Sequence, residues 1–201
     1  FIELSNQQLA YFKENAPYQK SWNAKRIVAV DGSLLNLPHT KDVENAFGGV
    51  VNQHEKIVSA RCSFAYDVCN ELVLDAVIAP RRSCEKELAI GHLPSLNPST
   101  DILVFDRGYP SQWLIGLLMK QGFEFCFRLS TACKRATTLM SEGSSDIDWT
   151  MHHNTHKCCD NMKTYNIPKQ LTGLRLVAIN LSSGEKEILL TNLTDREKFS
   201  T

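Results

Sequence analysis

Two apolar runs that each end on an aspartate constrain the fold of this chain most. The first run, RIVAVD, covers residues 26–31, and the second, ILVFD, covers residues 102–106. Continuous runs of β-branched and apolar residues are typical of central strands that are covered on both faces. An aspartate at the end of a strand is most often a turn or cap residue. Asp31 and Asp106 therefore carry a function only if the fold places them side by side.

The segments between and after these runs predict a mixed α/β sheet. Residues 56–67 alternate between apolar and polar side chains, which indicates a half-exposed antiparallel strand, and residues 72–80 follow closely as the next strand of a meander. Helices are expected over residues 83–93 and 110–122, and a further strand over 123–130. The order is therefore three strands, helix, strand, helix, strand.

Composition divides the chain into three parts. Residues 1–24 are expected to form a helical lead-in, and residues 25–130 the strands and helices of the sheet, with a polar loop over 39–55. From residue 131 the composition shifts towards Ser, Thr, Lys, His and Cys, and two later apolar runs joined by SSGE predict a hairpin. We interpret residues 131–201 as a β-rich insertion.

Three antiparallel strands followed by a crossover to a fourth strand beside the first form a ribonuclease H (RNase H)-like sheet. In that sheet Asp31 and Asp106 are neighbours on strands about 4.8 Å apart. Two carboxylates about 4 Å apart repel by roughly 4 kcal/mol at an effective dielectric constant of about 20, and a shared divalent cation removes this repulsion. Oxygen ligands favour Mg²⁺ or Mn²⁺, and two such ions about 3.5 to 4 Å apart support cleavage of a phosphodiester. Asp31 and Asp106 are therefore the candidate catalytic and metal-binding residues.

Four segments resemble the DDE transposases of bacterial insertion sequences, and the likeness extends over nearly all of the chain. The segments read VAVDGSLLNLP, KELAIGHL, ILVFDRGYPSQWLIGLLMKQGFEFCFRLS and RLVAINLSSGEKEILLTNLTD. The most specific block is Asp-Arg-Gly-Tyr at residues 106–109, which is followed by a helix, Gly122, an aromatic strand and Arg128. The ending Leu-Thr-Asn-Leu at residues 190–193 is the second anchor.

The resemblance implies an RNase H-like core that the β-rich insertion interrupts before the last helix. It further implies an enzyme that cuts transposon ends and joins them to target DNA at a two-metal Mg²⁺ or Mn²⁺ site, as a homodimer on DNA. Asp31 and Asp106 match the first two acidic residues of the family's triad. The third is a glutamate in a helix with the pattern Y-x-x-R-x-x-x-E-x-x-x-x-x-x-K, which this sequence lacks. The third carboxylate is thus expected beyond Thr201, and the chain alone is expected to be an inactive fragment.

Three residues of the matching segments are candidates for DNA contacts. The planar guanidinium groups of Arg107 and Arg128 suit phosphate oxygens or a ligand carboxylate, and surface salt bridges of little energetic value are the competing interpretation. Tyr109 is expected either to stack on a base or to cap the entrance of the following helix. A further set of basic residues is expected to line a DNA path or to be ordinary solvated surface residues: Arg81, Arg82, Lys134, Arg135, Lys157, Lys163 and Lys169.

A histidine- and cysteine-rich stretch offers an alternative metal site. His152, His153, His156, Cys158 and Cys159 lie within a few residues of one another and are ligands that zinc prefers. Their spacing matches no standard zinc finger, so an exposed loop or strand is the competing interpretation.

The bulk composition narrows the class of protein. Twenty-two basic and 22 acidic residues give a net charge of zero, which argues against a chain that only wraps nucleic acid. The sequence has no apolar run of membrane-spanning length and no signal-peptide pattern, so a cytoplasmic protein with reduced cysteines is expected. Two alternatives to a transposase stay open: an RNase H-like hydrolytic nuclease, and a non-catalytic DNA-binding or interaction protein that retains the fold.

Overall fold

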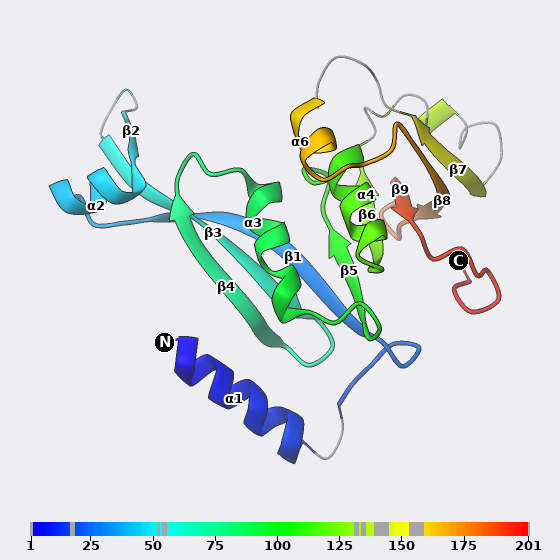
Figure 1. The fold of residues 1–201 in the computed structure, drawn as a ribbon, viewed down its shortest axis with the longest axis horizontal. Helices are drawn as coiled ribbons and strands as arrows, with labels where there is room; N and C mark the ends of the chain where they lie inside the picture. Colours follow the sequence, from blue (N-terminus) through cyan, green and yellow to red (C-terminus); the bar gives the residue numbers. More distant parts are fainter. Residues whose placement is uncertain are drawn as a thin grey trace.

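The computed structural model describes residues 2–16, 19–51, 53, 56–130, 133, 136–138, 145–152 and 159–200. In this part of the chain, nine strands form one mixed sheet (Figure 1). The strands are β1 (Arg26–Asn36), β2 (Gly49–Val51), β3 (Lys56–Asp67), β4 (Leu72–Pro80), β5 (Asp101–Phe105), β6 (Glu124–Leu129), β7 (Asp146–His152), β8 (Gln170–Asn180) and β9 (Lys186–Thr191). The helices are α1 (Ile2–Asn15), α2 (Lys41–Phe47), α3 (Glu85–Gly91), the 3-10 helix η1 (Leu93–Ser95), α4 (Gln112–Lys120) and α6 (Cys159–Thr164). None of these helices is long and apolar enough to cross a membrane.

The core of the sheet has the strand order β4-β3-β1-β5-β6, and β2 pairs with the first residues of β3. The strands β1, β3 and β4 are antiparallel neighbours, whereas β1, β5 and β6 run parallel. This arrangement is the predicted meander followed by parallel strands with crossover helices. The predicted RNase H-like α/β fold is therefore confirmed.

Both crossover helices lie on the same face of the sheet. The helix α3 connects β4 to β5 and α4 connects β5 to β6, and right-handed crossovers in one direction along a sheet place their helices on one side. On α4, Leu114, Ile115 and Leu118 are completely buried and belong to one core cluster with Val30 of β1 and Phe105 of β5. This packing holds the ends of β1 and β5 side by side.

The β-rich part of the chain continues the same sheet. The strand β9 pairs antiparallel with β6, from Cys126↔Thr191 to Leu129↔Ile188, and β8 and β7 follow outward. The predicted hairpin is confirmed as β8 and β9, and its turn contains Gly184 with a φ of +83°, a left-handed conformation that favours glycine. The strands after residue 145 are thus hydrogen-bonded to the core sheet through β6.

Two sequence-based expectations about the first half of the chain were wrong. Residues 39–55 contain the helix α2 and the strand β2 instead of a simple polar loop. The strand β3 is not half exposed, because Ser59 and Ser63 are fully buried. Ser63 is hydrogen-bonded to Nε2 of His92 at 2.9 Å, and Nδ1 of His92 is hydrogen-bonded to Asp75 at 2.8 Å. Alternation of apolar and polar residues shows that the two faces of a strand differ in polarity. It does not show whether other elements of the fold cover the polar face.

The contact of α4 with the segment before β8 yields a testable prediction about packing. A Cβ atom at Gly116 would lie 2.3 Å from Cγ2 of Ile167 and 3.4 Å from Leu171. We expect Gly116→Ala to lower the free energy of unfolding by about 1 to 3 kcal/mol, because overpacking outweighs a helix-propensity gain of at most about 1 kcal/mol. Urea denaturation measures the difference.

Gly91→Ala is the matched control for this prediction. Both substitutions add one methyl group to a helical glycine, but no atom of the described residues lies within 4 Å of the Cβ position of Gly91. Alanine at residue 91 should therefore leave the stability unchanged or raise it slightly. Equal losses of stability in the two variants would contradict the packing argument.

Candidate active site

Asp31 lies in β1, and Asp106 directly follows β5, the parallel neighbour of β1. The strands β1 and β5 stay in register up to the pair Val30↔Phe105, so the next position brings Asp31 opposite Asp106. Ile27 lines a cavity on the face of the sheet opposite to α3 and α4, which we call the open face. Side chains alternate along a strand, so Asp31 points to the open face as well. The structure thus brings together the two aspartates that the sequence singles out.

Both carboxylates reach the solvent. The Asp106 side chain is 58% exposed, and its Oδ1 lies 3.4 Å from Nη1 of Arg128. Asp31 is also exposed, and its Oδ1 accepts the backbone N–H of Gly32 at 2.8 Å. Exposed carboxylates of this kind can exchange water for a cation without first breaking a buried ion pair.

A glutamate that sequence reasoning missed holds two of the candidate DNA-binding arginines. Glu187 on β9 accepts a hydrogen bond from Arg107 at 2.8 Å and another from Arg128 on β6. The hydrogen bond from Arg128 is the main cause that lowers the pKa of Glu187, and Arg107 adds to it. The ionised glutamate therefore fixes both guanidinium groups close to Asp106. No local pattern signals this pairing, because 80 and 59 residues separate Glu187 from Arg107 and Arg128.

Tyr109 lies in the core of the protein. Only 2% of the residue is exposed, and the centroid of its ring lies 5.4 Å from that of Phe105. Its backbone N–H donates to the carbonyl of Asp106 at 3.1 Å, which closes the turn after β5. Burial, followed by the negative charge of Asp31 and then that of Asp106, raises the pKa of Tyr109 to about 12, so the hydroxyl stays protonated. A base does not reach the buried ring in this arrangement, which leaves the hydroxyl as its functional group.

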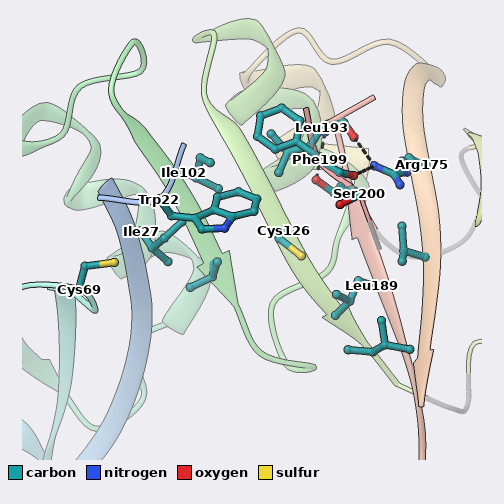
Figure 2. A pocket seen from close by; sticks show the side chains of 14 residues that line it. Trp22, Ile27, Cys69, Ile102, Cys126, Arg175, Leu189, Leu193, Phe199 and Ser200 are labelled. Atoms are coloured by element: carbon teal, nitrogen blue, oxygen red, sulfur yellow. Dashed lines mark hydrogen bonds between the residues drawn. The ribbon is translucent and has the colours of Figure 1, made fainter. Parts of the chain in front are cut away.

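The open face also carries an apolar cavity of about 530 Å³. Figure 2 shows around it Trp22, Ile27, Ile102, Cys126, Leu189 and Phe199. At one end Arg175 donates to the backbone carbonyls of Leu193 at 3.1 Å and Phe199 at 2.8 Å. Burial raises the pKa of the Cys126 thiol to about 11, so it stays protonated. No Asp or Glu is among the described residues that line this cavity, so the candidate site for phosphate chemistry is the pair of aspartates.

The donor chemistry of the aspartate pair fits Mg²⁺ or Mn²⁺. Asp31 in β1 and Asp106 directly after β5 provide carboxylate oxygens, the ligands that these ions prefer. Water, phosphate or a further carboxylate would complete the coordination. Among the residues that the structure describes, no group of three or more His, Cys, Asp and Glu side chains is placed to hold a metal ion.

Several other candidates of the sequence analysis lie outside the described residues. These are His153, His156 and Cys158 of the candidate zinc site, and Lys134, Arg135 and Lys157 of the candidate DNA path. Of the rest, His152 is exposed at the end of β7, Arg81 donates to the hydroxyl of Ser59, and Arg82, Lys163 and Lys169 are exposed. The zinc site and the DNA path therefore stay predictions.

Comparisons with known proteins identify the family. The family model described as the transposase DDE domain matches residues 22–192. Among solved structures, the piggyBac transposase synaptic complex with hairpin DNA has a similar fold, with a TM-score of 0.52 and 11% sequence identity over 85% of this chain and 34% of that chain. A comparison with curated proteins finds no match. Because the family model spans both aspartates, the Asp-Arg-Gly-Tyr turn and Glu187, this chain belongs to the transposase DDE domain family.

Proposed function

We propose that this chain forms part of the catalytic domain of a DDE transposase, which cleaves DNA at transposon ends and transfers the strands to target DNA with Mg²⁺ or Mn²⁺. The register of β1 and β5 supports the proposal, because its last pair, Val30↔Phe105, directly precedes Asp31 and Asp106. The match to the transposase DDE domain favours this function over a hydrolytic nuclease or a non-catalytic binding protein. A strand-transfer assay distinguishes a transposase from a hydrolytic nuclease, because only a transposase gives joined products.

Asp31 and Asp106 would hold the metal ions of this site. A bound pair of divalent ions activates an attacking hydroxyl and stabilises the leaving oxygen of a phosphodiester. The contribution of the protein is preorganisation, because the core packing beneath β1 and β5 would hold the strand ends that carry both carboxylates side by side. Arg128 lies beside Asp106 and reduces the repulsion between the two carboxylates.

Arg107 and Arg128 are proposed to hold DNA phosphate next to the carboxylates. Their side chains are 40% and 39% exposed, although both are hydrogen-bonded to Glu187. A guanidinium group carries five N–H donors, so each arginine retains donors for phosphate oxygens. Glu187 therefore positions the two arginines without using up their capacity to bind DNA.

The third carboxylate of the triad is proposed to lie on a helix outside this sequence. The basis is the absence of the family's glutamate pattern from residues 1–201. Without that group the chain alone is proposed to be inactive, and the complete protein is proposed to act as a homodimer on DNA ends. The resemblance to DDE transposases supports both statements.

Crystals of this chain soaked in Mn²⁺ test the proposed metal site. We expect an anomalous difference peak next to the carboxylate oxygens of both Asp31 and Asp106, because a shared cation relieves their mutual repulsion. The peak should disappear in Asp106→Asn and persist in Asp148→Asn, a control whose side chain is 79% exposed and pairs with Arg196. A peak elsewhere, or none, would contradict the proposal.

A further inference from the structure

The two arginines beside the proposed catalytic aspartates belong to a row of four alternating charges. Oδ1 of Asp106 lies 3.4 Å from Nη1 of Arg128, and Nη2 of Arg128 is hydrogen-bonded to Glu187. The guanidinium group of Arg107 donates to the same glutamate at 2.8 Å. Negative and positive groups therefore alternate along the row, and its two carboxylates balance its two guanidinium groups.

Glu187 is the most shielded member of this row. Its side chain is 10% exposed, whereas those of Arg107 and Arg128 are 40% and 39% exposed. Water screens a charge less when the group is largely covered. The glutamate therefore offsets much of the field of both arginines, although each arginine still reaches the solvent.

Asp31 makes the metal-free site negative. It follows Val30, whose register partner in β5 is Phe105, the residue before Asp106, and its carboxylate is exposed. With Asp31, three carboxylates stand against two guanidinium groups, so one negative charge remains. A DNA phosphate gains no net attraction from such a site, because its own charge is also negative. A divalent cation bound by the aspartates would reverse the sign of the net charge.

We propose that Glu187 makes DNA binding at this site depend on the divalent cation. This inference rests on the proposed roles of the aspartates in metal binding and of the arginines in phosphate binding. Without the cation, Glu187 keeps Arg107 and Arg128 neutralised, and phosphate is held weakly. With the cation, the site is positive and attracts phosphate, so DNA is held there when the metal for cleavage is present. Coupling between two ligands is reciprocal, and DNA therefore raises the affinity for the cation by the same factor.

Glu187→Gln tests the inference, because it keeps the size of the side chain and a hydrogen-bond acceptor but removes the charge. Binding of a fluorescent DNA oligonucleotide to the chain is measured by anisotropy at low ionic strength, in EDTA and in Mn²⁺. In the wild type we expect Mn²⁺ to tighten DNA binding by about tenfold, because the cation acts within a few ångströms of the phosphate although water screens part of its field. In EDTA, Glu187→Gln should bind the oligonucleotide more tightly than the wild type, and Mn²⁺ should then add less.

Two further variants control for overall charge and for the position of the cation. Glu185→Gln removes the same charge from an exposed residue directly before β9, and it should behave like the wild type in EDTA and in Mn²⁺. Asp106→Asn should abolish the effect of Mn²⁺ on DNA binding, because the cation loses a proposed ligand. Electron paramagnetic resonance of free Mn²⁺ measures the reciprocal effect: saturating oligonucleotide should tighten Mn²⁺ binding to the wild type by the same factor.

The outcomes distinguish this inference from the function on which it rests. Weaker or equal DNA binding by Glu187→Gln in EDTA limits the glutamate to hydrogen-bonding the arginines and overturns its electrostatic role. DNA binding by the wild type that does not respond to Mn²⁺, or a response that persists in Asp106→Asn, overturns the coupling. Failure of the proposed function has a different signature: Mn²⁺ does not bind the wild-type chain, or Arg107→Gln and Arg128→Gln leave DNA binding unchanged in Mn²⁺.

Discussion

Asp106→Asn is expected to abolish metal-dependent strand cleavage by the complete transposase while the protein stays folded. The substitution keeps the shape of the side chain and removes the charge that is proposed to bind the metal. Stabilisation of transition-state charge by bound metal amounts to several kcal/mol, which corresponds to a loss of roughly a thousandfold or more in rate. Single-turnover cleavage of a transposon-end substrate in Mg²⁺ and in Mn²⁺ measures this loss.

Asp31→Asn should reproduce the loss, because Asp31 is the neighbour of Asp106 in register. Asp148→Asn is again the control, since it removes an exposed carboxylate elsewhere and should leave cleavage unchanged. The melting temperature of the metal-free Asp31 and Asp106 variants should not fall, because each substitution removes a repulsion between exposed carboxylates. Cleavage at the wild-type rate in either variant would exclude that aspartate from the site.

Arg175→Ala is expected to destabilise the protein by about 3 to 5 kcal/mol, the range for removing one partner of a buried ion pair. Arg175 is 2% exposed and donates to both carboxylate oxygens of Asp146, at 2.8 and 2.7 Å. It also donates to the carbonyls of Leu193 and Phe199. Alanine leaves both carbonyls and Oδ1 of Asp146 without their Arg175 donor, while Oδ2 keeps its hydrogen bond from Arg196, so β7, β8 and the C-terminal segment lose a common anchor. Urea denaturation at neutral pH measures the change.

Arg196→Ala is the matched control, because Arg196 pairs with the same carboxylate from an exposed position. Its side chain is 43% exposed, against 3% for Arg175, so its loss should change the stability by no more than about 1 kcal/mol. Arg175 is the main cause that lowers the pKa of Asp146 from its ordinary value of 3.8. The stabilisation from the ionised aspartate is therefore present above pH 3.8 and is lost as the pH falls through the lowered pKa. Equal losses of unfolding free energy in Arg175→Ala and Arg196→Ala would refute the argument that burial makes the Arg175 ion pair the stronger one.

The sequence is sufficient to predict the part of the fold that carries the aspartates. The continuous apolar runs at residues 26–30 and 102–105 are typical of central parallel strands, although β1 is buried mainly on the face of α3 and α4, where Val28 and Val30 lie. The short connection between β3 and β4 makes them antiparallel neighbours, β1 pairs with β3 across the longer segment 37–55, and the crossover rule then places β5 beside β1. The adjacency of Asp31 and Asp106 follows from these constraints before any side chain is placed.

The surroundings of the site could not be predicted in the same way. Glu187 reaches Arg107 and Arg128 only because β9 pairs with β6, and no local period of the sequence encodes which strand a distant hairpin joins. The burial of Ser63 depends on His92, which lies in the segment after α3. The buried position of Tyr109 is likewise a tertiary effect, because a tyrosine after a turn has no intrinsic preference for the interior. Long-range packing determines the contacts of Glu187 and the burial of Ser63 and Tyr109.

The continuity of the sheet from β6 into β9 has a mechanical consequence. Backbone hydrogen bonds along a ladder resist sliding of one strand past its neighbour, so β9 cannot shift without straining β6. Because Glu187 and Arg128 sit on these two strands, a DNA duplex that presses on the β-rich strands would also displace the guanidinium groups next to Asp106. DNA bound at these strands would thereby change the electrostatic field at the proposed catalytic aspartates through the rigidity of the sheet.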